Sequence, residues 1–151
     1  MRTFLVIGGS GKTGRRVVER LGGAGHEARS ASRRSPATPF DWSDAATHAA
    51  AVAGAEGVFL TVAGQDPANA ERVAGFLDTA AGHGVGHAVL LSARAVEFHP
   101  QGALAAVEQA VAAAPLSHTI LRPSWFAQNF TEAFLAPDDD GVVSAPTGDG
   151  R

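Results

Sequence analysis

The sequence contains no cysteine and no tyrosine, and Lys12 is its only lysine. Without cysteine, disulfide bonds, thiolate metal ligands and a cysteine nucleophile are all excluded. No stretch approaches the ~20 apolar residues that a membrane-spanning helix needs. The first apolar run, Phe4 to Ile7, is far too short for the core of a secretory signal peptide. We therefore expect a cytoplasmic protein with no membrane segment.

Positive charge is also in short supply. The formal net charge is −3 over 151 residues, which argues against nucleic acid as a partner, because that interaction requires a basic surface. Hydrophobic residues make up 45% of the sequence and charged residues 18%, as in ordinary globular domains. The length suits one domain over residues 1–151, with a small molecule as its substrate.

Short apolar runs alternate with stretches of helical periodicity. Strands are expected at 4–7, 27–32, 40–42, 58–62, 88–91 and 119–121. Helices are expected at 13–21, 43–54, 66–80 and 101–113, and a further short one from Phe126, Phe130 and Phe134. Ser43 and Asp66 are the expected caps of the second and third helices. The pattern predicts an α/β fold of the Rossmann type: a doubly wound parallel sheet in three layers, α/β/α.

A glycine-rich loop follows the first strand and precedes the first helix. Its residues are Gly8, Gly9, Ser10, Gly11, Lys12, Thr13 and Gly14. The spacing G-x-x-G-x-x-G in this context is typical of dinucleotide binding, because the glycines allow a tight turn and a close approach of the pyrophosphate. The helix N-terminus and the hydroxyls of Ser10 and Thr13 add hydrogen-bond donors. The alternative is a structural glycine turn without a ligand.

The end of the second strand indicates which dinucleotide is bound. NAD-binding domains carry Asp or Glu there to accept from the ribose 2′-hydroxyl. This sequence instead reads Ser32-Arg33-Arg34, and a guanidinium can pair with a 2′-phosphate. We therefore predict NADP(H) in preference to NAD(H), with Arg33 as the main ligand and Arg34 as the second. The alternative is that both are solvated surface arginines.

Three further motifs extend the pattern, and together with the loop they resemble one family. They are Ser32-Arg33-Arg34, Phe40-Asp41-Trp42, and the run from Leu121 to Phe130, which reads LRPSWFAQNF. The combination resembles the NmrA-like group of atypical short-chain dehydrogenases/reductases. Within that group, the combination resembles the branch that contains agroclavine dehydrogenase and festuclavine synthase, together with their bacterial relatives.

The resemblance implies further cofactor contacts. Asp41 and Trp42 would lie near the adenine, and Val62 and Ala63 would pass the ribose. Ser92, Pro123 and Phe126 would border the nicotinamide. As alternatives, Trp42 and Phe126 would belong to the core, and Ser92 would have a structural role. The histidines and the acidic run Asp138-Asp139-Asp140 lack metal-ligand spacing, so no metal site is expected.

The resemblance also bears on chemistry. Typical short-chain dehydrogenases donate a proton from a Tyr-x-x-x-Lys pair, which this chain lacks. Hydride transfer from NADPH to an imine, iminium or quinone-type acceptor makes weaker demands, and we assign no catalytic residue. The alternatives are a dinucleotide-sensing regulatory protein, as NmrA is, or a truncated inactive fragment. Relatives continue into a substrate lobe, so 136–151 is expected to form a loop leading to a lobe absent here. A homodimer and a regulatory protein partner both remain open.

Overall fold

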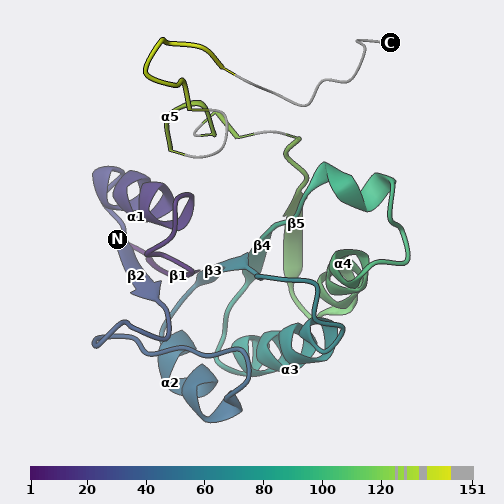
Figure 1. Ribbon diagram of the computed structural model, residues 1–151. Coiled ribbons are helices and arrows are strands. Elements are labelled where there is room, and N and C mark those ends of the chain that lie inside the picture. The colour runs from purple at the N-terminus through teal and green to yellow at the C-terminus, as the bar shows by residue number, and fades with distance from the viewer. Residues whose placement is uncertain (125, 128, 133–135, 144–151) are drawn as a thin grey trace.

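The computed structural model describes residues 1–124, 126–127, 129–132 and 136–143. Its centre is a sheet of five parallel strands in the order β2-β1-β3-β4-β5 (Figure 1). The strands are β1 (Thr3–Ile7), β2 (Glu27–Ala31), β3 (Gly57–Thr61), β4 (His87–Leu91) and β5 (Ser117–Leu121). This arrangement confirms the predicted parallel, doubly wound α/β fold.

Helices cover both faces of the sheet, as predicted. Helix α1 (Gly14–Gly23) lies on one face, and α2 (His48–Val52), α3 (Asn69–Gly82) and α4 (Ala103–Ala113) lie on the other (Figure 1). Two 3₁₀ turns, η1 (Ala45–Thr47) and η2 (Arg94–Glu97), precede α2 and α4, and α5 (Asn129–Glu132) follows β5. In the part of the chain that is described, no helix is long and apolar enough to cross a membrane.

The hydrophobic core lies between the sheet and the α2–α4 layer. Leu60 of β3 and Leu90 of β4 are fully buried there, against Phe76 and Leu77 of α3. The alternation of side chains along each strand places these leucines on one face of the sheet. Burial of this face fixes the strand register, and the register sets where each strand ends.

The expected strand at 40–42 is wrong. This segment makes only isolated bridges, between Ser32 and Pro39 and between Asp41 and Asp44. Pro39 has no backbone N–H for a ladder hydrogen bond, and the chain turns back after Asp41. Phe40 is apolar because its side chain is buried in the core rather than because it belongs to a strand. The centroids of the Phe40 and Phe76 rings lie 5.3 Å apart.

Two of the expected helix caps also differ. The carboxylate of Asp44, rather than Ser43, accepts the backbone N–H of Ala46 at the start of η1. Helix α3 begins at Asn69 rather than at Asp66. The reason is that Asp66 accepts the N–H of Ala68 in a local turn, which precedes the helix instead of forming its first turn.

Three phenylalanines indicated the last helix, and the structure fully describes one of them, Phe126. Helix α5 covers Asn129–Glu132. Phe134 and the side chain of Phe130 lie outside the described residues. The described stretch 136–143 contains no helix or strand, and the rest of the loop expected over 136–151 lies outside the described residues.

Candidate dinucleotide site

The chain reverses its direction across the sheet between β1 and β3. From β1 it passes outward to β2, whereas from β3 it passes to β4 and β5 on the other side. Ligands of open α/β sheets bind beyond the carboxyl ends of the strands at such a point. A cleft of about 420 Å³ opens there. Among the residues that line it are these predicted ones: Gly8, Ser32, Arg33, Asp41, Trp42, Val62 and Ala63.

Of the residues of the glycine loop, Gly8 lines this cleft, whereas those from Gly9 to Gly14 do not. Three of its glycines are required for different structural reasons. Gly8 has φ +77°, which L side chains rarely adopt. A Cβ atom at Gly14 would lie 2.7 Å from the carbonyl carbon of Gly8 and collide with its oxygen, so the helix could not start this close to the strand. A Cβ at Gly11 would meet only the carbonyl oxygen of Gly8, at 3.2 Å. Gly11 therefore leaves open space on the exposed side of the loop.

The loop also presents hydrogen-bond donors. Its turn is held by hydrogen bonds from the N–H of Gly9 to Val6 and from the N–H of Gly11 to Gly8. The N–H groups of Ser10 and Thr13 have no acceptor among the described residues. Thr13 precedes the first turn of α1, and its hydroxyl makes no capping bond. This arrangement suits an anion at the N-terminus of α1.

The two arginines after β2 lie differently with respect to the cleft. Both are exposed, but Arg33 lines the cleft and Arg34 does not. Neither makes a hydrogen bond or an ion pair with another described residue. The guanidinium of Arg33 is therefore available to an anionic ligand in the cleft, and the prediction for Arg34 has no such support.

Hydrogen bonds to Ser43 and Thr61 hold the side chains of Asp41 and Trp42 in place. Asp41 accepts the hydroxyl of Ser43 at 2.7 Å and its N–H at 2.9 Å. These bonds lower the pKa of Asp41, and Arg33 and Arg72 contribute smaller attractions. The indole N–H of Trp42 donates to the carbonyl oxygen of Thr61 at 3.2 Å. Trp42 is half-buried, so it both packs on the core and lines the cleft.

The sequence analysis did not predict five polar residues that line the cleft: Ser43, Thr61, Asp66, Asn69 and Arg72. Arg72 donates from Nη1 to Asp66 Oδ2 at 2.6 Å, and Asn69 donates to the carbonyl oxygen of Ala63 at 3.3 Å. The N–H of Ala68 and then Arg72 lower the pKa of Asp66. The available signal was position: polar residues that follow a buried strand lie at the edge of the sheet where ligands bind.

The residues predicted for the nicotinamide end do not line this cleft. Ser92 is only 5% exposed, and its hydroxyl donates to Glu108 of α4. The carbonyl oxygen of Pro123 accepts the N–H of Arg94 at 3.0 Å, and that of Phe126 accepts the N–H of Asn129 at 2.9 Å. Their roles toward a cofactor stay predictions. Trp125 and Gln128 of the same motif lie outside the described residues.

Glu108 is the centre of a buried polar cluster. Besides Ser92, it accepts hydrogen bonds from Arg122, from Nε at 3.0 Å and from Nη2 at 2.5 Å. Burial raises the pKa of Glu108, but the hydrogen bonds from Arg122 and Ser92 outweigh it, and the pKa is lowered from its ordinary value. The Ser92 hydroxyl is therefore engaged by a carboxylate.

Sequence comparisons agree with this geometry. A profile of the protein family described as NAD(P)H-binding matches residues 8–146. The chain is 30% identical over 162 residues to prestalk A differentiation protein A of Dictyostelium discoideum, covering 97% of this chain and 53% of that protein. It is 31% identical over 158 residues to the uncharacterized oxidoreductase YesF of Bacillus subtilis (strain 168), covering 98% and 54%. The chain thus spans about half the length of these curated relatives.

Solved structures show the same fold. NmrA, a negative transcriptional regulator solved in complex with NAD, matches with a TM-score of 0.74 over 94% of this chain and 52% of that one. The sequence identity is 16%, so this likeness concerns the fold alone. These comparisons do not show the resemblance to the agroclavine dehydrogenase branch, which stays a prediction.

Proposed function

Because the chain belongs to the NAD(P)H-binding family, we propose that it is the NADP(H)-binding domain of an NmrA-like oxidoreductase. The observation that carries the choice of NADP(H) is the position of Arg33. This arginine lines the cleft beside the end of β2 and has no ion-pair partner among the described residues. A guanidinium so placed suits the 2′-phosphate, which two parallel hydrogen bonds can hold.

The other charges of the cleft support the same choice. Asp66 is paired with Arg72, and Asp41 is bonded to Ser43, so both carboxylates are already engaged. No Asp or Glu stands at the end of β2, where an NAD-binding domain would use one to bind the 2′-hydroxyl. In the described part of the chain, Arg33 is therefore the one cation lining the cleft that makes no hydrogen bond or ion pair, although it attracts Asp41 at longer range.

The cofactor would supply a hydride, and the residues of this chain would orient it. The glycine loop, with the N–H groups of Ser10 and Thr13, would hold the pyrophosphate, and Trp42 would wall the adenosine end. With no tyrosine in the sequence, Lys12 in the loop and Ser92 bonded to Glu108, we assign no protein group as proton donor. We propose an imine, iminium or quinone-type acceptor, because each can accept hydride without a positioned tyrosine.

A second candidate function is dinucleotide sensing without catalysis. The engagement of Ser92 by Glu108 favours it, because that hydroxyl is then unable to assist a reaction. Steady oxidation of NADPH, followed by absorbance with imine and quinone acceptors, separates the two functions. Turnover that depends on both protein and acceptor supports the oxidoreductase. Binding of NADPH with no turnover for any acceptor supports the sensor.

A further inference from the structure

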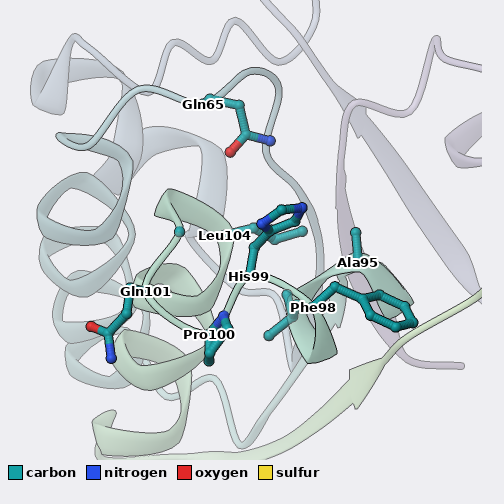
Figure 2. Close-up of a pocket in the computed structure, with 9 residues that line it drawn as sticks. Gln65, Ala95, Phe98, His99, Pro100, Gln101 and Leu104 are labelled. Carbon is teal, nitrogen blue, oxygen red and sulfur yellow. The ribbon is translucent and has the colours of Figure 1, made fainter.

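Two cavities of the molecule differ in how firmly the side chains of their walls are held. One, with a volume of about 640 Å³, is bounded by the β3–α3 loop, η2 and α4 (Figure 2). In Figure 2 the ring of Phe98 points away from His99 and Gln65, and neither of these two side chains makes a hydrogen bond with another described residue. In the dinucleotide cleft, by contrast, the segment that carries Asp41 and Trp42 is held by side chains that do not themselves line the cleft.

Two consecutive residues hold the backbone of Asp41. Its N–H donates to Oγ1 of Thr47 at 3.1 Å, and its carbonyl oxygen accepts from Nε2 of His48 at 2.9 Å. A carbonyl oxygen can only accept, so Nε2 of His48 carries a proton. Thr47 ends η1 and His48 begins α2, and neither lines the cleft. Any effect of this pair on a ligand therefore passes through Asp41 and its neighbours.

The hydroxyl of Thr47 has a specific place in this arrangement. It donates its own proton to the carbonyl oxygen of Asp44 at 2.7 Å, which leaves a lone pair to accept the N–H of Asp41. Among the described residues, Thr47 is the one acceptor for that N–H. The carbonyl oxygen of Asp41 also accepts the N–H of Asp44 at 3.2 Å, which closes the turn. Loss of the Thr47 hydroxyl would thus leave a half-buried N–H unpaired, which is costly.

The ring of His48 touches the residues on both sides of Asp41. It is 4% exposed and stacks on Phe40, with the ring centroids 4.9 Å apart and the planes 16° from parallel. It also makes an edge contact with Trp42 at 6.3 Å. Phe76 of α3 closes the same cluster, 5.5 Å from the His48 ring. His48 is therefore fixed by packing, and its Nε2 has little freedom to move away from Asp41.

These contacts determine where Trp42 lies. The carbonyl group of Asp41 belongs to the planar peptide bond that joins Asp41 to Trp42, so the bond from His48 fixes the plane from which the Trp42 side chain projects. The indole N–H then donates to the carbonyl oxygen of Thr61 at 3.2 Å. With its backbone and its indole both held, the Trp42 ring keeps one orientation in the wall of the cleft.

We propose that Thr47 and His48 are positioning residues for the adenosine end of a bound dinucleotide. They hold the peptide groups on the two sides of Asp41 and so keep the Trp42 ring in the wall of the cleft. The proposal rests on the proposed function of that cleft. NADPH and NADH share the adenosine, so this role is independent of the preference between them that we assign to Arg33.

The test uses Thr47→Val and His48→Phe, each of which removes one hydrogen bond and keeps most of the side-chain volume. Affinities for NADPH and NADH are measured by calorimetric titration. We expect each substitution to weaken both dinucleotides by the same factor, about fivefold or more, which corresponds to one lost hydrogen bond. Unchanged affinities, or a loss confined to NADPH, would overturn the proposal.

Two further variants separate positioning from a general loss of stability. Thr79→Val is the matched control for Thr47→Val, because Thr79 is also half-buried, donates to a carbonyl oxygen within α3 and does not line the cleft. It should leave both affinities unchanged. His48→Gln keeps an N–H donor and should bind both dinucleotides within about twofold of the parent. A glutamine variant as weak as His48→Phe would overturn the role of the His48 hydrogen bond.

A spectroscopic measurement without ligand separates this proposal from the proposed function. In a Trp125→Phe background, Trp42 is the only tryptophan, and its near-UV circular dichroism band reports a ring held in one orientation. We expect Thr47→Val to lose much of this band while its far-UV signal stays that of the folded chain. Loss of the band in a chain that binds no dinucleotide would sink the cofactor assignment alone. Dinucleotide binding by the parent, with band and affinities unchanged in the variants, would sink the positioning role alone.

Discussion

The guanidinium of Arg122 meets the carboxylate of Glu108 at 2.5 Å between Nη2 and Oε2. Glu108 lies on α4, and Arg122 directly follows β5. Because Ser92 donates to the same carboxylate, the cluster also reaches the end of β4. One buried side chain thus joins a helix to the ends of two neighbouring strands, at the edge of the sheet that carries the candidate site.

Glu108→Gln should lower the free energy of unfolding. The Glu108 side chain is 7% exposed and that of Arg122 is 44% exposed. Water can partly replace the lost bonds of Arg122, so we expect a loss of about 1–3 kcal/mol, the range for hydrogen bonds to charged groups, rather than that of a fully buried pair. Urea unfolding measures it. The control is Glu97→Gln, in the exposed pair with Arg94, which should cost under about 1 kcal/mol. Equal losses would contradict this view.

The same pair should make stability sensitive to acid. The pKa of Glu108 is lowered in the folded chain, so its contribution is complete above the ordinary glutamate value of about 4.3. That contribution is lost as the pH falls from this value through the lower folded-state pKa. Unfolding measured between about pH 6 and 3 should show a smaller acid loss in Glu108→Gln than in the parent. Parallel curves for the two proteins would show that Glu108 plays no part.

Gly14→Ala tests the close approach of α1 to β1. The added Cβ would collide with the backbone of Gly8, so the loop must shift or the helix start must unravel. We expect NADPH binding to be lost and stability to fall by about 1–3 kcal/mol. Gly22→Ala is the control on the same helix, since a Cβ there meets nothing within 4 Å. It should be neutral or stabilising by up to about 1 kcal/mol.

Trp42 should report on the adenosine end of the cleft. In a Trp125→Phe background it is the only tryptophan, and it lines the cleft while its indole N–H donates to Thr61. We expect saturable quenching of its fluorescence by NADPH. Quenching should disappear in Gly14→Ala, because the added Cβ distorts the phosphate-binding loop and NADPH binding is lost. Unchanged fluorescence at saturating NADPH, with binding established by calorimetry, would place the adenosine elsewhere.

The sequence predicted what local pattern determines. The spacing of the glycines and the apolar run before them predicted the position of the glycine loop. The alternation of apolar runs with helical stretches predicted the parallel sheet. The segment 40–42 was misjudged because burial of Phe40 in a turn produces the same apolar signal as a strand. Helix α3 begins at Asn69 rather than at the predicted Asp66, because the Asp66 side chain accepts the N–H of Ala68 in a turn before the helix.

Contacts between distant residues gave no comparable signal. Ser92, Glu108 and Arg122 are spread over three elements, and no single segment indicates that they meet. Asp66, Asn69 and Arg72 belong to the cleft only because β3 ends beside β1. Their place depends on strand order, which the crossover rules narrow but the residues themselves do not state.

The central claim is tested by calorimetric titration of the chain and of Arg33→Ala with NADPH and, separately, with NADH. The account predicts that the parent prefers NADPH, and that Arg33→Ala weakens NADPH by about 1–3 kcal/mol while NADH hardly changes. Arg34→Ala is the matched control, because that arginine does not line the cleft. An equal loss for both dinucleotides, or no binding of either by the parent, would contradict the account.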